Sequence, residues 1–242
     1  MSDINISVDG GTSKRLLTAG KYCESDIVVT ASGGGGDDDT LKGIIERTAT
    51  SVNIPAGTTM IADNVFSNYS TLVSVTVPSG VKKIGRAAFN YCDGLTSITL
   101  PSDLEELGAT AFYSCSKIVS IDLPSGLKKI GQSAFQYCTK LALTELPSEV
   151  MSLGSYAFAD CTALALTSIP SGLKDLGYNY TFRSCTGLTE ITFEGTPTYM
   201  SSSTFNGCTN LLTINVPWAE GAVANAPWGA TNATINYNYT GA

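Results

Sequence analysis

The stretch Leu95-Thr-Ser-Ile-Thr-Leu-Pro-Ser-Asp-Leu-Glu-Glu-Leu-Gly-Ala-Thr-Ala-Phe-Tyr-Ser-Cys115 contains every part of a unit that recurs along most of this 242-residue chain. Its proline, its Ala-Phe pair and its cysteine return in the same order, mostly at a spacing of 23 residues. One residue is inserted between Pro170 and Phe182, after which the pattern resumes as far as Pro217. A fixed period of this length indicates a solenoid of similar stacked turns.

Each unit has recognisable local structure. Ile98-Thr-Leu100 alternates as a strand does, and the proline after it ends the strand because proline cannot donate to a ladder. Gly108 predicts a tight turn. Ala111, Phe112 and Cys115 have the spacing of one inward-facing helical turn. The sequence therefore predicts an α/β solenoid of about seven turns, each with a short parallel strand and a single helical turn.

The unit L-x-x-I-x-L-P-S-x-L-x-x-I-G-x-x-A-F-x-x-C resembles the BspA-like, Treponema-type leucine-rich repeat over residues 51–217. This resemblance implies a right-handed leucine-rich solenoid that serves binding and carries no family catalytic residues. Proteins that resemble it are commonly bacterial surface adhesins. The stretch from Leu16 to Val29 resembles segments of tail-associated proteins of phages and prophages, which implies a place in a virion.

Composition divides the chain into five regions. Residues 1–32 are predicted to form a small β module that serves attachment, because two β-like runs surround glycine breaks. Residues 33–39, four glycines and three aspartates, predict a linker. Residues 40–50 predict an N-terminal capping helix, residues 51–217 the leucine-rich repeats, and residues 218–242 a C-terminal cap.

The residue composition argues against catalysis and against nucleic-acid binding. The chain has no histidine, so the commonest general base and the commonest transition-metal ligand are missing. Its formal net charge is −7, which disfavours a nucleic-acid partner. The four glycines of the linker lack the pattern of a phosphate-binding loop, and its consecutive aspartates lack the spacing of a metal site. We expect no enzyme, no cofactor and no bound metal.

Six of the seven cysteines share one repeat position beside the Ala-Phe pair. A column of buried free thiols explains this position better than disulfides do. Cys23 lies outside the array and is also expected to be a packed thiol. The six are Cys92, Cys115, Cys138, Cys161, Cys185 and Cys208.

The N-terminal sequence has neither a basic leader nor an apolar run, so we expect no secretory signal peptide. No stretch approaches the ~20 apolar residues of a membrane helix, so no membrane insertion is expected. The expected location is a virion, as part of a phage tail, or the extracellular side of a bacterial surface. In the virion case, other virion proteins are expected to bind the N-terminal module.

Two departures from uniform repetition predict structure. The pairs Lys82-Lys83, Glu105-Glu106 and Lys128-Lys129 fall at one repeat position in successive units and should pair across turns, disfavouring slipped stacking. In residues 141–144 and 164–167, leucine comes one step earlier than Ile98 does in its unit. A one-step shift changes which face a side chain meets, so strand irregularity is expected there.

The outward strand positions form a hydroxyl-rich, mildly acidic face that is a candidate for binding a protein or a cell-surface glycan. Polar residues that favour strands also suit any solvated strand surface, so both interpretations stay open. The candidate residues on this face are Thr99, Asp122, Glu145 and Glu190.

Aromatic residues gather toward the C-terminus and supply a second candidate site. Tyr178, Tyr180 and Tyr199 have the amphipathic rings that suit interfaces and sugar faces. Trp218 and Trp228 more readily fit a cap over the last turn. The sequence therefore predicts a non-enzymatic binding or adhesion protein, associated with a phage or prophage tail, or alternatively a bacterial cell-surface adhesin. An enzyme of unrecognised type is the remaining alternative.

Overall fold

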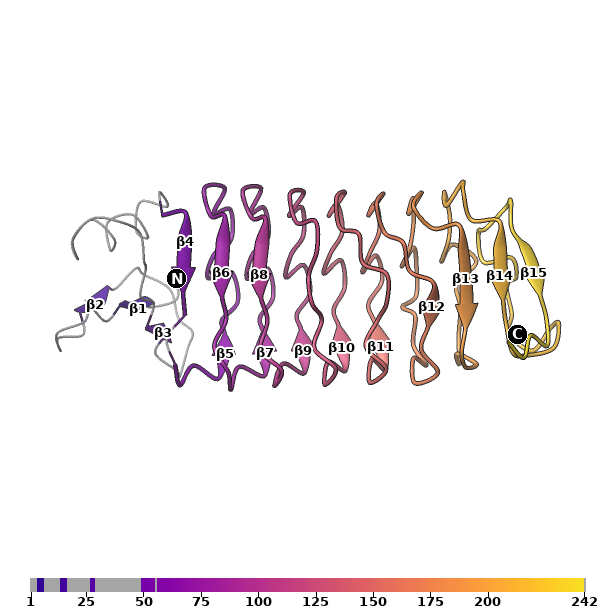
Figure 1. Cartoon of the computed structure of the whole chain (residues 1–242), viewed down its shortest axis with the longest axis horizontal. Helices are drawn as coiled ribbons and strands as arrows, with labels where there is room; N and C mark the ends of the chain where they lie inside the picture. Colours follow the sequence, from indigo (N-terminus) through magenta and orange to yellow (C-terminus); the bar gives the residue numbers. More distant parts are fainter. Residues whose placement is uncertain (1–3, 7–13, 17–26, 29–48, 55, 242) are drawn as a thin grey trace.

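The computed structural model describes residues 4–6, 14–16, 27–28, 49–54 and 56–241. The repeats wind into a row of stacked turns, which Figure 1 shows side-on from the indigo end to the yellow end. This parallel solenoid has about eight turns, and the leucine-rich solenoid prediction is confirmed. The described residues contain no helix, so the predicted helical turns are wrong.

The described strands are short, and most of them recur once per turn on one of two faces. They are β1 (Ile4–Ile6), β2 (Lys14–Leu16), β3 (Ile27–Val28), β4 (Ser51–Asn53), β5 (Met60–Ile61), β6 (Ser74–Thr76), β7 (Lys83–Ile84), β8 (Ser97–Thr99), β9 (Glu106–Leu107), β10 (Lys129–Ile130), β11 (Ser152–Leu153), β12 (Ser168–Ile169), β13 (Glu190–Phe193), β14 (Thr213–Asn215) and β15 (Thr234–Asn236).

One face of the solenoid, called here the glycine face, carries the five-stranded parallel sheet β5-β7-β9-β10-β11. The other, called here the proline face, carries β4-β6-β8 toward the N-terminus and β12-β13-β14-β15 toward the C-terminus. Equivalent residues of neighbouring turns pair in register, as Val52, Val75 and Ile98 do. In-register pairing stacks each column of side chains at the strand spacing of about 4.8 Å.

The N-terminal strands form a small sheet in which β1 pairs antiparallel with β2 and parallel with β3. The sequence predicts β-like runs near β1 and β3 and none near β2. The linker at 33–39, residues 40–48 of the predicted helix and Cys23 lie outside the described residues. The division of the chain into an attachment module, a linker and caps stays a prediction.

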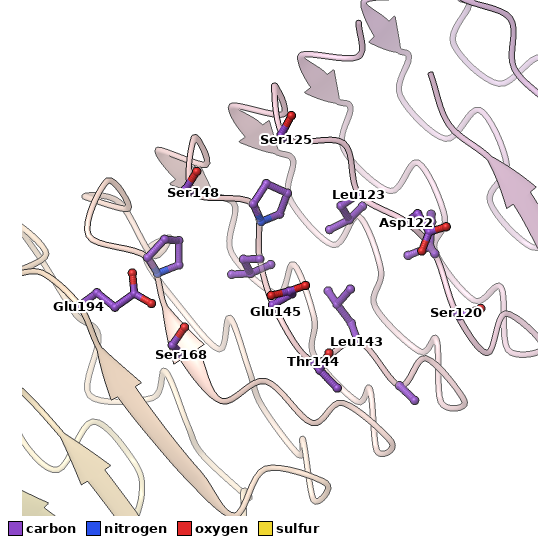
Figure 2. A pocket seen from close by; sticks show the side chains of 15 residues that line it. Ser120, Asp122, Leu123, Ser125, Leu143, Thr144, Glu145, Ser148, Ser168 and Glu194 are labelled. Atoms are coloured by element: carbon purple, nitrogen blue, oxygen red, sulfur yellow. The ribbon is translucent and has the colours of Figure 1, made fainter. Parts of the chain in front are cut away.

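The proline face has no described strand between β8 and β12 (Figure 2). The irregularity predicted for residues 141–144 is confirmed, because Thr144 is exposed where the equivalent Ile98 is buried. Leu146, rather than residue 144, turns inward there. The interruption also includes the turn of Ile121, although the sequence of this turn follows the repeat.

The Ala-Phe segment fails to form a helix because residues on both sides of it have left-handed backbone. Thr110 has φ of 53° and Ser114 has φ of 60°. The N–H groups of Thr110, Phe112 and Ser114 donate to carbonyls 22 residues ahead, at 2.7–2.8 Å. These bonds join neighbouring turns, whereas an α-helix would return them to carbonyls four residues back. The segment is therefore a third ladder that stacks the solenoid.

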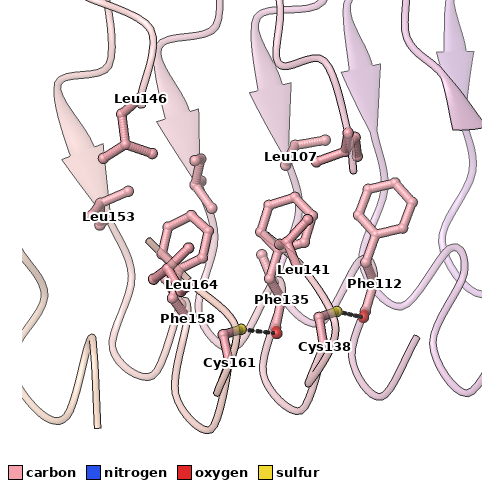
Figure 3. Close-up of a cluster of buried hydrophobic side chains, with 14 of the residues drawn as sticks. Leu107, Phe112, Phe135, Cys138, Leu141, Leu146, Leu153, Phe158, Cys161 and Leu164 are labelled. Atoms are coloured by element: carbon pink, nitrogen blue, oxygen red, sulfur yellow. Dashed lines mark hydrogen bonds between the residues drawn. The ribbon is translucent and has the colours of Figure 1, made fainter. Parts of the chain in front are cut away.

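The core consists of columns of similar apolar side chains (Figure 3). Phenylalanine rings of successive turns stack with centroids 5.2–5.8 Å apart, as Phe112 does on Phe135. Each cysteine Sγ donates to the carbonyl of the preceding turn's phenylalanine, as Cys138 does to Phe112 at 3.1 Å. The six array thiols are free and buried, which confirms the thiol column. Burial raises the pKa of the Cys208 thiol to about 12 and that of Cys138 well above its ordinary value.

Gly108 begins the predicted tight turn, in which the Ala111 N–H donates to the Gly108 carbonyl at 3.3 Å, and it also allows close approach between turns. Its φ lies outside the left-handed region, but an added Cβ would lie 2.7 Å from the carbonyl carbon of Gly85. Gly131 repeats this contact against Gly108 at 2.6 Å. A side chain there would separate the stacked turns, so the glycine column sets their spacing.

The two tryptophans lie at the C-terminal end of the core. Trp218 is 5% exposed and Trp228 is fully buried, with ring centroids 6.1 Å apart. Trp218 also packs edge-on against Phe193 at 5.3 Å, and Trp228 Nε1 donates to the Ala224 carbonyl at 2.7 Å. Burial of this kind suits a role in closing the end of the array rather than contact with a ligand.

Candidate binding groove

A groove of about 670 Å³ opens on the proline face, over the turns where the strand ladder is interrupted (Figure 2). Three successive turns and Glu194 of the next line it, so the groove runs along the stacking direction and crosses these turns. The lining residues are Ser120, Ile121, Asp122, Leu123, Ser125, Ala142, Leu143, Thr144, Glu145, Leu146, Pro147, Ser148, Ser168, Pro170 and Glu194.

The groove combines an apolar floor with acidic and hydroxyl groups. Ile121 and Leu146 are buried beneath it, while Leu123 and Leu143 are partly exposed. The lining includes three carboxylates, several serine and threonine hydroxyls, and no lysine or arginine. Its electrostatic character is therefore negative and is not balanced from within the groove.

Two of these carboxylates occupy one column of the repeat. Asp122 and Glu145 are 23 residues apart on adjacent turns, at the position that Thr99 and Ser168 hold on the flanking turns. All three groove acids, Glu194 included, are exposed, and none has an ion pair within the described part of the chain. The two carboxylates therefore place negative charge at one repeat position of neighbouring turns.

On the glycine face, by contrast, glutamates form ion pairs with lysines of the neighbouring turns, and the predicted pairing is confirmed. Glu105 lies 3.6 Å from Lys82 Nζ and 2.9 Å from Lys128 Nζ. Glu106 lies 3.3 Å from the Nζ atoms of both Lys83 and Lys129. The hydrogen bond and charge of Lys128 lower the pKa of the Glu105 carboxyl, and the same pair raises the pKa of Lys128.

Comparison with known proteins places this repeat. A family model for the BspA type leucine rich repeat region matches residues 46–165 and 105–222, well over half of the chain. The chain belongs to this family. The predicted resemblance to the BspA-like repeat is thereby confirmed. The predicted resemblance of the N-terminal segment to phage tail proteins is not shown.

Solved structures of bacterial leucine-rich repeat proteins are similar to this family member. The Treponema pallidum protein TpLRR is 22% identical, with 77% of this chain and 85% of that chain covered and a TM-score of 0.46. A leucine-rich repeat protein of Bacteroides ovatus is 22% identical, with 97% of this chain and 76% of that chain covered and a TM-score of 0.45. A leucine rich cell surface protein of Faecalibacterium prausnitzii is 20% identical, with 82% of this chain and 71% of that chain covered and a TM-score of 0.48. No curated protein matches the chain.

The structure separates the four predicted strand-face residues. Asp122 and Glu145 lie together in the groove, while Thr99 is exposed on β8 outside its lining. Glu190 on β13 lines a smaller hollow of about 310 Å³. Its Oε1 accepts from Asn215 Nδ2 at 2.7 Å, and Asn215 Oδ1 accepts from Asn236 Nδ2 at 2.8 Å. Glu190 thus belongs to a ladder that joins the last strands.

The three predicted tyrosines do not form one site. Tyr178 and Tyr199 are 75% and 44% exposed, with ring centroids 6.2 Å apart. Tyr199 continues the glycine face, because it bridges to the turn after β11. Tyr180 is half-buried, stacks on Tyr156 at 5.2 Å and lies under the Arg183 guanidinium at 5.9 Å. The tyrosine pair and the groove acids are therefore not neighbours in one pocket.

Two features of the surface were not identified as site elements from the sequence. Glu194 lines the groove, and its signal was visible, because glutamate stands where the repeat has proline. Tyr91, Tyr113 and Tyr137 form a row with centroids 5.2 and 5.4 Å apart. Tyr91 and Tyr137 directly precede a cysteine, whereas Tyr113 lies two residues before Cys115, so the repeat alignment alone does not give this row.

The described residues give little support for a metal site or for a cysteine nucleophile. Within the described residues, no group of three or more Asp, Glu, Cys or His side chains could hold a metal ion. The same residues include no helix that is long and apolar enough to cross a membrane. Five of the buried array thiols have raised pKa values, which is the opposite of what a cysteine nucleophile needs; they are Cys115, Cys138, Cys161, Cys185 and Cys208.

Proposed function

We propose that the protein is a non-enzymatic binding protein whose ligand docks in the groove of the proline face. The observation that supports this most strongly is the contrast between repeat positions. Proline, glycine, Ala-Phe and cysteine positions are all used in closing or stacking a turn. The groove lies where the strand ladder of the proline face is interrupted, and its acids have no ion pair among the described residues.

The ligand is a protein or a glycan of a cell surface, and the protein acts outside the cell. Membership of the BspA-type family supports a bacterial surface adhesin, because proteins with this repeat are typically found there. The virion alternative, in which the N-terminal strands attach to a phage tail, rests on the resemblance of that segment alone. Antibody labelling of intact bacteria and of purified particles distinguishes the two settings.

Binding of the labelled full chain to a panel of intact bacterial and epithelial cells tests the proposal. Thr144→Trp places an indole in the groove, because Thr144 is exposed and lines it. Thr209→Trp adds the same side chain at an exposed position outside the groove and serves as the matched control. We expect the first variant to lose binding and the second to retain it.

Two results would contradict the proposal. Equal binding by both tryptophan variants would move the site away from the groove. Failure of the unmodified chain to bind any member of the panel would remove the adhesion function itself.

A further inference from the structure

We infer that the groove accepts an extended polypeptide segment bearing lysine or arginine. This inference rests on the proposed function and names the class of its ligand. It starts from Asp122 and Glu145, which hold the same repeat position on adjacent turns and both line the groove. Elsewhere the same chain places lysine on both sides of Glu105 and Glu106. Asp122 and Glu145 have no such lysine neighbours, so they differ from the paired glutamates of the glycine face.

The distribution of the acids favours an extended ligand over a single ion. Figure 2 shows Asp122, Glu145 and Glu194 spread along the groove rather than gathered at one point. No described group of three acids is close enough to hold a metal ion. A cation at each of several places along a chain matches this distribution, because complementary charges give specificity to an interface.

The groove floor suits the stems of cationic side chains. Leu123, Leu143 and Pro147 expose apolar surface beside the carboxylates. Lysine and arginine lay their methylene groups along such surface while the charged head reaches an acid. Hydroxyl groups of Ser125, Ser148 and other lining residues are available to the amide groups of an extended backbone.

A neutral glycan fits the groove less well. Sugar rings stack on exposed aromatic faces, and the lining contains none. The exposed tyrosines of the described chain, such as Tyr91, Tyr137 and Tyr178, lie outside the lining. The observations therefore favour a basic polypeptide, and glycan binding becomes an outcome of the test.

Fluorescence anisotropy with two synthetic peptides tests this class of ligand on the full chain. In one labelled peptide lysine alternates with serine, and in the other glutamate replaces lysine. We expect the lysine peptide alone to bind. The double variant Asp122→Asn/Glu145→Gln should weaken its binding by about tenfold or more, since two charge contacts are lost.

The control variant is Asp93→Asn/Glu149→Gln, which changes net charge equally at exposed positions outside the groove. It should bind the lysine peptide as the unmodified chain does. Equal weakening by both double variants would show unspecific attraction to an acidic protein and overturn the inference. A thermal melt of each variant shows whether it is folded.

The outcome also separates the ligand class from the proposed function. If Thr144→Trp abolishes cell binding but the lysine peptide does not bind, the groove remains the site and the basic polypeptide is wrong. If a neutral oligosaccharide array, and not the peptide, binds in a manner blocked by Thr144→Trp, the ligand is a glycan. Peptide binding lost in Asp122→Asn/Glu145→Gln and retained in Asp93→Asn/Glu149→Gln supports the inference.

Discussion

The glycine face and the proline face are built from the same repeat, yet they differ in regularity and in charge. On the glycine face, β5, β7, β9, β10 and β11 form one uninterrupted parallel sheet, and each glutamate of the ladder contacts a lysine on both sides. On the proline face, the described sheet is interrupted between β8 and β12, and the acids there lack basic partners.

If the groove binds the ligand as proposed, this repeat protein separates stability from recognition. A turn can be closed and stacked by one set of positions while the opposite face changes with little effect on the core. Changes to the glycine face or the core columns should therefore affect stability. Changes to the groove should affect binding and leave the solenoid intact.

The largest expected effect comes from breaking the close contact between turns. Gly131→Ala would place a Cβ 2.6 Å from the backbone of Gly108, so we expect a loss of about 3 kcal/mol in the free energy of unfolding. Gly126→Ala is the control, because its Cβ would meet nothing nearer than 3.5 Å. Urea unfolding measures both. Similar stabilities for the two variants would show that the glycine column does not set the spacing.

A smaller loss is expected from the thiol column. Cys138→Ala removes a buried donor to the Phe112 carbonyl and should cost about 1–2 kcal/mol. The raised pKa keeps the thiol protonated in the folded protein. In the unfolded protein the thiol ionises once the pH exceeds its ordinary pKa of 9.0. Each such thiol therefore lowers stability by about 1.4 kcal/mol per pH unit above about pH 9.

Urea unfolding at neutral and alkaline pH checks this sign. The variant should lose stability less steeply than the unmodified chain as the pH rises, because it has one thiol fewer to ionise on unfolding. Thiol titration with Ellman's reagent supplies a second readout. The array thiols should react only after unfolding, and rapid reaction in the native state would argue against the buried column.

A still smaller effect is expected at the exposed charge ladder. Glu105→Lys/Glu106→Lys puts four lysines beside two new ones, so the Tm should fall by a few degrees and recover partly in salt. The lowered pKa of Glu105 means that its stabilising contribution is present above the ordinary carboxyl value of 4.5 and is lost as the pH falls below it. An unchanged Tm would show that the ladder does not stabilise the stack.

Much of the fold could be predicted because stacking repeats each local rule many times. The period located the phenylalanine and cysteine columns and the Lys-Glu-Lys ladder, and all of them are present. The helical turn was wrong because spacing alone does not reveal left-handed backbone at Thr110 and Ser114. The tight turn at Gly108 was predictable, but the close approach of Gly85 was not, because this contact joins two turns and depends on the tertiary structure.

The candidate site was predictable only in part. The shared column of Asp122 and Glu145 follows from the period, and the groove contains both. The sequence did not show that the ladder is already interrupted at the turn of Ile121, which opens the groove beside Asp122. The tyrosines were grouped by their nearness in sequence, yet Tyr180 packs under Arg183 while Tyr178 faces Tyr199.

The most direct test of the contrast between the faces is the Tm at low salt of two neutralised variants. Glu105→Gln/Glu106→Gln removes acids that have lysine partners, and Asp122→Asn/Glu145→Gln removes acids of like charge that have no ion pair among the described residues. We predict that the first variant melts below the unmodified chain and that the second melts at the same temperature or slightly above it. A similar fall in Tm for both variants would contradict the account, because it would mean that the groove acids also stabilise the fold.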